Sequence, residues 1–135
     1  MTTRWKAVIV AVSVAVLPLS TGFAQDSTKT MPPGVKVSST SLGPTLVDAK
    51  GMTLYTWGND TIPGKSACNG QCAANWIPLA AAADATPMGD WTIIARDDNS
   101  KQWAYKGKPL YTFKSDANAG EVNGNGRGQW MAAKP

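Results

Sequence analysis

The chain contains no histidine, and this absence excludes the commonest ways of activating a nucleophile. Without an imidazole there is no Ser-His or Cys-His pair, and the Gly-x-Ser-x-Gly motif of many hydrolases does not occur. Glu121 is the only glutamate, so a pair of catalytic carboxylates would have to come from aspartates. The composition therefore favours a protein that is not an enzyme, and we predict no catalytic residue and no cofactor.

Cysteine is nearly absent too, with only Cys68 and Cys72. If the stretch between them forms one helical turn, their Cα atoms lie about 6 Å apart, a separation that a disulfide tolerates. In an oxidising compartment we expect a disulfide there, beside a short helix that ends near Trp76 because Pro78 cannot continue it. The C-x-x-x-C spacing differs from the C-x-x-C of thioredoxin-like proteins, although a redox role stays open. A tetrahedral metal site would need further ligands, so none is predicted.

The sequence also lacks a hydrophobic run long enough to span a membrane. Arg4 and Lys6 precede an apolar run over residues 7–19, which is shorter than the roughly 20 residues of a spanning helix. This pattern, followed by small and polar residues up to Ala24, predicts a signal peptide over residues 1–24. We expect a periplasmic or secreted protein with no stable membrane insertion after cleavage.

Charge is sparse in the remaining chain. Removal of the signal peptide leaves a net charge of about +2, which is too small and dispersed to indicate nucleic-acid binding. Residues 25–34 are polar, end in a proline pair and a glycine, and are expected to be a flexible lead-in. Residues 35–135 then form one small domain.

An internal repeat organises that domain. Lys50-Gly51, the segment Leu54-Tyr55-Thr56-Trp57 and Asp60 recur 56 positions later as Lys106-Gly107, Leu110-Tyr111-Thr112-Phe113 and Asp116. Such a repeat predicts two copies of one supersecondary unit, each unable to bury its apolar face alone. We place copy one at residues 35–76, a linker at 77–90 and copy two at 91–135.

The predicted fold class is mainly β. Three short strands are expected in each copy, bounded by turn residues: 35–39, 45–47 and 53–57, then 91–96, 102–105 and 108–113. The two three-stranded meanders would be related by a pseudo-two-fold axis. The sequence does not choose between a small sandwich and a closed six-stranded sheet.

The repeated motif supplies the candidate site. Side chains alternate along a strand, so the two aromatic residues of each motif share one face. One interpretation is that these aromatics fill the core while the aspartates accept hydrogen bonds from turn amides. The other is that they line a shared ligand groove, with the aspartates as its polar groups. The candidate ligand-binding residues are Tyr55, Trp57, Asp60, Trp103, Tyr111, Phe113 and Asp116.

Together these motifs carry a family resemblance. The doubled Tyr-Thr-aromatic-x-x-Asp pattern, the segment 66–76 around the cysteines and the segment 102–111 resemble the bacterial secreted-repeat family, described as predicted lipoproteins with a Yx(F/W/Y)xxD motif. The resemblance implies an extracytoplasmic domain of unknown function. This chain lacks the lipidation cysteine of such lipoproteins, and Met131 follows Trp130 where we expect relatives to carry histidine.

We therefore expect a non-catalytic binding or protein-interaction module of the cell envelope, whose partner is an unknown envelope protein or a small ligand. The alternative is a periplasmic redox or metal and electron-transfer accessory protein that uses Cys68 and Cys72. The two hypotheses differ in whether these cysteines are reduced and accessible to solvent.

Overall fold

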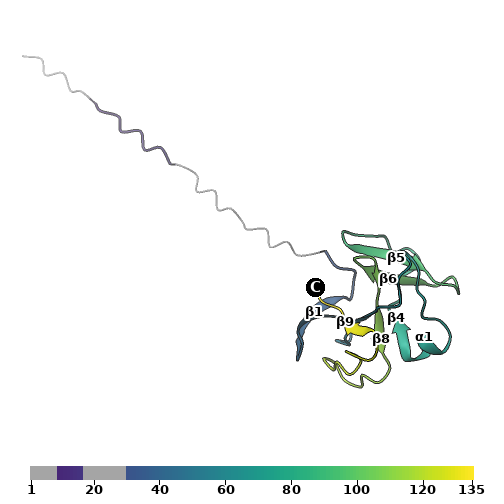
Figure 1. Cartoon of the computed structure of the whole chain (residues 1–135). Helices are drawn as coiled ribbons and strands as arrows, with labels where there is room; N and C mark the ends of the chain where they lie inside the picture. The colour runs from purple at the N-terminus through teal and green to yellow at the C-terminus, as the bar shows by residue number, and fades with distance from the viewer. Residues whose placement is uncertain (1–8, 17–29) are drawn as a thin grey trace, which may run out of the picture.

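The computed structural model describes residues 9–16 and 30–135 (Figure 1). The predicted signal peptide falls largely on residues 1–8 and 17–24, and half of the predicted flexible segment falls on residues 25–29, all outside the described residues. Within the described part of the chain, no helix has the length and apolar character needed to cross a membrane.

The described residues form nine short strands and one helix, and this confirms the mainly β prediction with its single helix beside the cysteines. In chain order the elements are β1 (Lys36–Thr40), β2 (Gly43–Val47), β3 (Tyr55–Trp57), α1 (Gln71–Asn75), β4 (Trp76–Pro78), β5 (Trp91–Ala95), β6 (Lys101–Tyr105), β7 (Lys108–Pro109), β8 (Tyr111–Phe113) and β9 (Trp130–Ala132).

These strands make three antiparallel sheets. Strands β1 and β2 form a hairpin, β5, β6 and β7 form a three-stranded sheet, and the order β4-β8-β3-β9 forms the central sheet. Because β4 covers Trp76–Pro78, regular structure reaches into the segment 77–90 that the sequence suggested as a linker.

The central sheet is built by exchange between the two copies. Its middle strands β3 and β8 pair at Tyr55 and Tyr111, the first residues of the two motif strands. Strand β4 of copy one pairs with β8 of copy two, whereas β9 of copy two pairs with β3 of copy one. Two three-stranded meanders were expected, one in each copy, but a three-residue strand offers few backbone bonds, and the exchange gives each motif strand a neighbour on both sides.

The exchange continues just beyond the strands. Leu79 donates its N–H to the carbonyl of Leu110 and accepts from the N–H of Trp103, both at 2.9 Å. The matching bonds in the other half join Ala133 to Leu46 at 2.9 Å and to Leu54 at 2.8 Å. Each copy therefore completes the backbone hydrogen bonding of the other.

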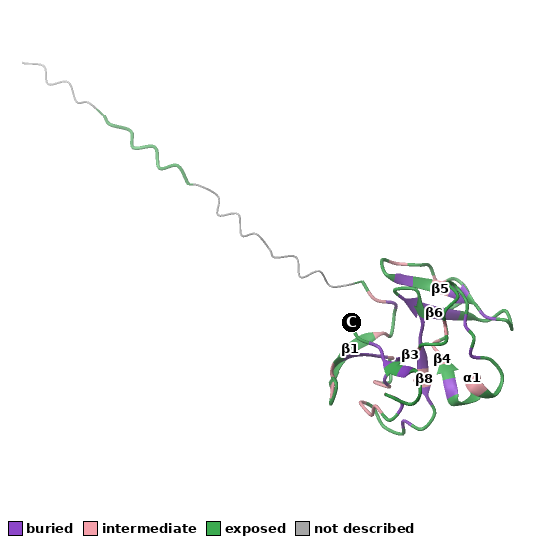
Figure 2. Cartoon of the chain, in the orientation of Figure 1, coloured by how far each residue is buried: buried purple, intermediate pink, exposed green. Residues whose placement is uncertain are grey.

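Two hydrophobic clusters form the core, and neighbouring residues of each motif belong to different clusters because side chains alternate along the chain. Leu54 and Leu110 point to a cluster that also holds Leu46, Trp91, Trp103, Tyr105 and Ala133. The neighbouring tyrosines belong to the second cluster, with Cys68, Trp76, Phe113, Trp130 and Ala132. Figure 2 shows the buried residues gathered in β3, β6 and β8, while β1 is exposed.

The cysteines lie at the start of the short helix. Cys68 and Cys72 form a disulfide with a Cα separation of 5.2 Å, and this confirms the predicted bridge. Helix α1 ends at Asn75, where Trp76 turns to extended backbone and Pro78 follows two residues later. The bridge therefore anchors the connection from β3 to β4.

Candidate functional site

The repeated motif forms two crossed tyrosine–aspartate pairs. The hydroxyl of Tyr55 in copy one donates to Asp116 Oδ2 in copy two at 2.6 Å. The hydroxyl of Tyr111 in copy two donates to Asp60 Oδ2 in copy one, also at 2.6 Å. Each motif therefore supplies the tyrosine of one pair and the aspartate of the other.

Peptide groups occupy the second oxygen of each carboxylate. Asp60 Oδ1 accepts the N–H of Ala67 at 2.7 Å, and Asp116 Oδ1 accepts the N–H of Asn123 at 3.0 Å. Each aspartate therefore fixes the loop that follows a motif strand, as the turn interpretation of the sequence suggested.

The tyrosine hydroxyls in these pairs are held in their neutral form. Burial raises the pKa of both Tyr55 and Tyr111 well above the ordinary value of about 10, and the hydrogen bond to the carboxylate raises it further. Both side chains are completely buried. The crossed pairs therefore act as fixed hydrogen bonds at neutral pH.

An aromatic stack runs beside the crossed pairs. The rings of Trp57, Trp130, Trp76 and Phe113 follow one another with centroid separations of 5.1, 3.8 and 4.2 Å. The stack alternates between residues of the two copies and fills the space between the central sheet and the loops after β3 and β8. Gly124 lets one loop approach it closely, since a Cβ there would lie 2.8 Å from a ring carbon of Trp76.

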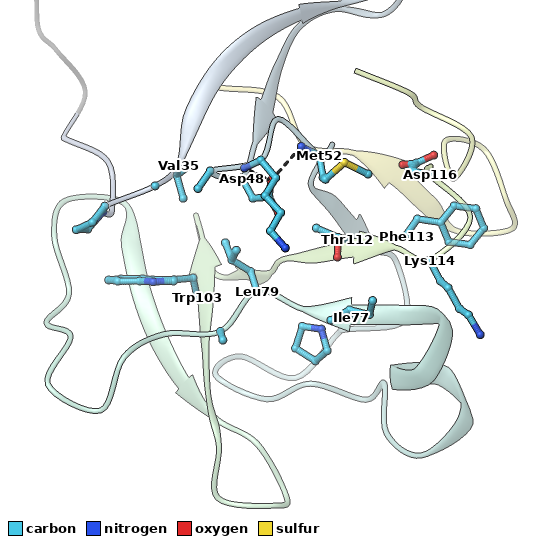
Figure 3. Close-up of a pocket in the computed structure, with 16 residues that line it drawn as sticks. Val35, Asp48, Met52, Ile77, Leu79, Trp103, Thr112, Phe113, Lys114 and Asp116 are labelled. Carbon is cyan, nitrogen blue, oxygen red and sulfur yellow. Dashed lines mark hydrogen bonds between the residues drawn. The ribbon is translucent and has the colours of Figure 1, made fainter. Parts of the chain in front are cut away.

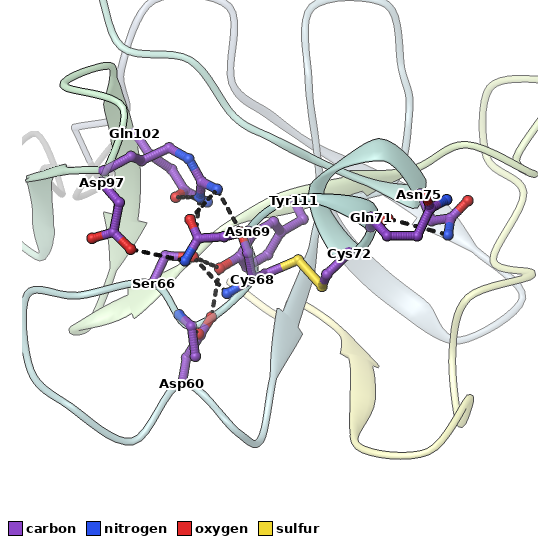
Figure 4. The surroundings of a disulfide bond; sticks show 12 residues. Asp60, Ser66, Cys68, Asn69, Gln71, Cys72, Asn75, Asp97, Gln102 and Tyr111 are labelled. Carbon is purple, nitrogen blue, oxygen red and sulfur yellow. Dashed lines mark hydrogen bonds between the residues drawn. A yellow bond between two sulfur atoms is a disulfide. The ribbon is translucent and has the colours of Figure 1, made fainter.

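A buried polar network ties the disulfide loop to one crossed pair (Figure 4). Ser66 Oγ lies 2.6 Å from the Tyr111 hydroxyl and accepts the N–H of Cys68 at 3.1 Å. The guanidinium of Arg96, which is 8% exposed, donates to Ser66 Oγ at 3.0 Å and to Gln102 Oε1 at 2.8 Å. It also donates to the carbonyl of Cys68. The disulfide loop is thus held by the same interactions that hold the motif.

A surface groove lies on the other side of the central sheet, bounded by the β2–β3 turn, β4, the end of β8 and residues 33–35 (Figure 3). Its volume is about 640 Å³. A second hollow of about 400 Å³ shares Pro33, Ala80 and Trp103 with it and continues under residues 82–88. The apolar lining includes Val35, Met52, Ile77, Leu79, Trp103 and Phe113.

The charged groups of the groove differ in how they are bonded. Asp116 is one of its acids and accepts hydrogen bonds on both oxygens, as described above. Asp48, the other acid, uses Oδ1 to accept the N–H groups of Lys50 and Met52 at 2.9 and 3.0 Å. The side chains of Lys50 and Lys114 are exposed, and the one ion pair among the described residues lies elsewhere.

Comparison with known families explains the repeat. The family model for a secreted repeat of unknown function matches residues 36–80 and, again, residues 92–134. The chain belongs to this secreted-repeat family. No curated protein and no solved structure matches the chain. The first matched segment includes β4 and the second includes β9, so each secreted repeat carries the strand that it gives to its partner.

The structure places the predicted site residues of this secreted-repeat protein in two overlapping sets. Trp103, Phe113 and Asp116 line the groove, although the two aromatic side chains are only 5% and 8% exposed. All seven except Trp103 take part in the crossed pairs or the stack, so Phe113 and Asp116 belong to both sets.

Sequence reasoning missed the groove residues that solvent reaches most easily. Ile77 is 47% exposed and lies between Trp76 and Pro78, where the sequence suggested the start of a linker. The sequence feature that could have indicated Ile77 is its position between Trp76 and Pro78, as a large apolar residue at the centre of a short extended segment. Arg96 was also missed, because an arginine at the end of a strand before a polar turn normally reaches solvent.

Proposed function

We propose that this protein is a non-catalytic binding module of the cell envelope, periplasmic or secreted, and that the groove over β4 and β8 is its binding site. The observation that carries the proposal is a difference in bonding between the side chains of the motif and the exposed side chains of the groove. The tyrosine and aspartate side chains of the motif form hydrogen bonds between the repeats, including Asp116 in the groove lining. The groove also presents an exposed isoleucine and two exposed lysines that form no ion pair with a carboxylate of the described residues.

The groove has the composition of a binding site. Ligand pockets combine apolar walls with a few polar groups and have volumes of roughly 300–1,000 Å³, a range that includes this groove. Its position supports the same conclusion, because it lies where the N-terminal segment, a turn of copy one and the last residues of β8 meet. Because the two repeats contact each other through the motif, the groove over β4 and β8 is available to bind another molecule.

The alternative redox function has less support. Cys68 is completely buried, and its carbonyl accepts a hydrogen bond from Arg96 inside the polar network. Thiol–disulfide exchange needs a thiolate to reach a disulfide sulfur, and burial blocks that approach at Cys68, whereas Cys72 is half-buried. The disulfide is better explained as a structural brace for the loop before α1.

Native mass spectrometry after incubation with an extract of the cell envelope tests the proposal. Ile77→Glu places a charge on the groove floor, and Leu42→Glu makes the same change at a side chain that is 37% exposed in the β1–β2 turn, outside the groove. We expect an added mass on the wild type and on Leu42→Glu that Ile77→Glu does not retain. Equal retention by both variants, or none by the wild type, would refute the groove as the binding site.

A further inference from the structure

We infer that the groove binds a single-chain amphiphile, with an aliphatic tail along the floor and an anionic head between Lys50 and Lys114. This inference rests on the proposed binding function and adds the chemical class of the ligand. Three features of the groove support the inference: its exposed apolar surface is aliphatic, it adjoins a second hollow, and its exposed lysines lie in the main groove.

The exposed apolar surface of the groove is aliphatic. Protein sites for sugars commonly offer the face of an aromatic ring, but Trp103 and Phe113 are only 5% and 8% exposed. Ile77 is 47% exposed, and Met52 and Leu79 are half-buried in the same lining. Such a surface gains free energy by covering hydrocarbon and offers little to a hydroxylated ring.

The groove is also long enough for a chain-like ligand. Residues 77–80 run along its floor as an extended segment, and Trp103 lies where the main groove joins the second hollow (Figure 3). The two hollows, of about 640 and 400 Å³, adjoin at Pro33, Ala80 and Trp103, which line both. A flexible hydrocarbon chain can follow this path and remain in contact with apolar atoms over its length.

Charge gives the ligand a direction. Lys50 and Lys114 lie in the main groove, where Asp116 accepts hydrogen bonds from the protein on both oxygens. Asp48 uses one oxygen to fix the turn that carries Lys50. The second hollow contains the exposed Asp84. Both lysine side chains are exposed, whereas Asp116 is buried and Asp48 is half-buried, so the lysines are the charged groups that a carboxylate head can contact. Lys101 donates to the carbonyl of Ala83 beside Asp84, so the second hollow offers a carboxylate no comparable pair of free cations, and we place the tail toward Trp103.

Isothermal titration with dodecanoate, at concentrations below micelle formation, tests the inference on the intact mature chain. We expect one dodecanoate bound per protein and a negative heat-capacity change, because apolar surface is buried. Ile77→Glu should weaken binding at least tenfold, while Leu42→Glu should leave it unchanged. Replacement of Lys50 and Lys114 by Gln should weaken binding roughly two- to fivefold for each lysine.

Matched controls distinguish the contribution of the charged head group to the affinity from that of the aliphatic tail. The pair Lys36→Gln and Lys108→Gln removes the same charge from β1 and β7, outside the groove lining, and should not change the affinity. Dodecanol, which has the same tail and no charge, should bind more weakly than dodecanoate. Higher salt should reduce this difference, since screening weakens exposed charge pairs.

Other outcomes overturn the inference in recognisable ways. If dodecanol binds as tightly as dodecanoate and the lysine variants have no effect, the anionic head is wrong but the binding groove stands. If dodecanoate does not bind while Ile77→Glu still abolishes an added mass from the envelope extract, the ligand class is wrong and the proposed function survives. Sedimentation with phosphatidylglycerol vesicles without binding of monomeric dodecanoate would assign the surface to a membrane.

Discussion

Loss of one tyrosine hydroxyl from a crossed pair should cost more than an ordinary hydrogen bond. In Tyr55→Phe the carboxylate of Asp116, only 5% exposed, loses its partner on Oδ2. The N–H of Gly124 also loses the tyrosine oxygen that accepts it at 3.2 Å. Hydrogen bonds to charged groups contribute about 1.5–3 kcal/mol, so we expect the free energy of unfolding to fall by about 2–3 kcal/mol in urea titrations.

A double-mutant cycle identifies the partner of each tyrosine. Tyr55→Phe combined with Asp116→Asn, and Tyr111→Phe combined with Asp60→Asn, should each show a coupling energy of about 1–3 kcal/mol. The combination of Tyr55→Phe with Asp60→Asn, both within one repeat, should be additive to within about 0.5 kcal/mol. Strong coupling within a repeat and none across the repeats would refute the crossed arrangement.

Three further predictions concern pH, the disulfide and a tight contact. Because the folded-state pKa of Tyr55 and Tyr111 is raised above the unfolded value of about 10, their stabilising contribution is complete well below pH 10 and is lost as pH rises above it. The free energy of unfolding should fall by about 0.7 kcal/mol per pH unit for each tyrosine at pH 10 and by about 1.4 kcal/mol per pH unit above about pH 11, measured as the difference in urea unfolding between the wild type and the double Phe variant. Replacement of Cys68 and Cys72 by Ser should lower stability by about 2 kcal/mol, because the closed loop is short; an unchanged urea midpoint would contradict this. Gly124→Ala should destabilise the protein by roughly 1–3 kcal/mol through overpacking against the stacked rings, visible as a lower melting temperature.

The sequence predicted the mainly β class, the repeat and the disulfide because each depends on local patterns. Alternation of side chains, turn residues and the spacing of two cysteines are readable within a few residues. The exchange of β4 and β9 was not predicted, since nothing in a three-residue strand such as Trp76–Pro78 indicates which copy it pairs with. Strand partners are set by tertiary packing, here by Trp76 opposite Phe113 and Trp57 opposite Trp130.

The candidate site was predicted less well for a related reason. The motif contains the most recognisable residues, so the sequence drew attention to Tyr55, Asp60, Tyr111 and Asp116. Their regular recurrence is equally typical of residues that hold two copies together, and only three-dimensional contacts separate the two cases. The groove residues, by contrast, come from segments without a shared sequence pattern. Ile77 was not predicted because the sequence placed it at the start of the linker, residues 77–90.

The crossed pairs also tie the two copies of the repeat to each other. A tyrosine that must reach the aspartate of the other repeat constrains both copies at once, and a change at Tyr111 affects Asp60 and the Ser66–Arg96 network that holds the disulfide loop. Ile77, by contrast, is exposed and takes no part in the crossed pairs, so a change there leaves these contacts in place. The interlocked repeats therefore provide a frame in which the proposed binding surface can be altered at Ile77 without disturbing the motif.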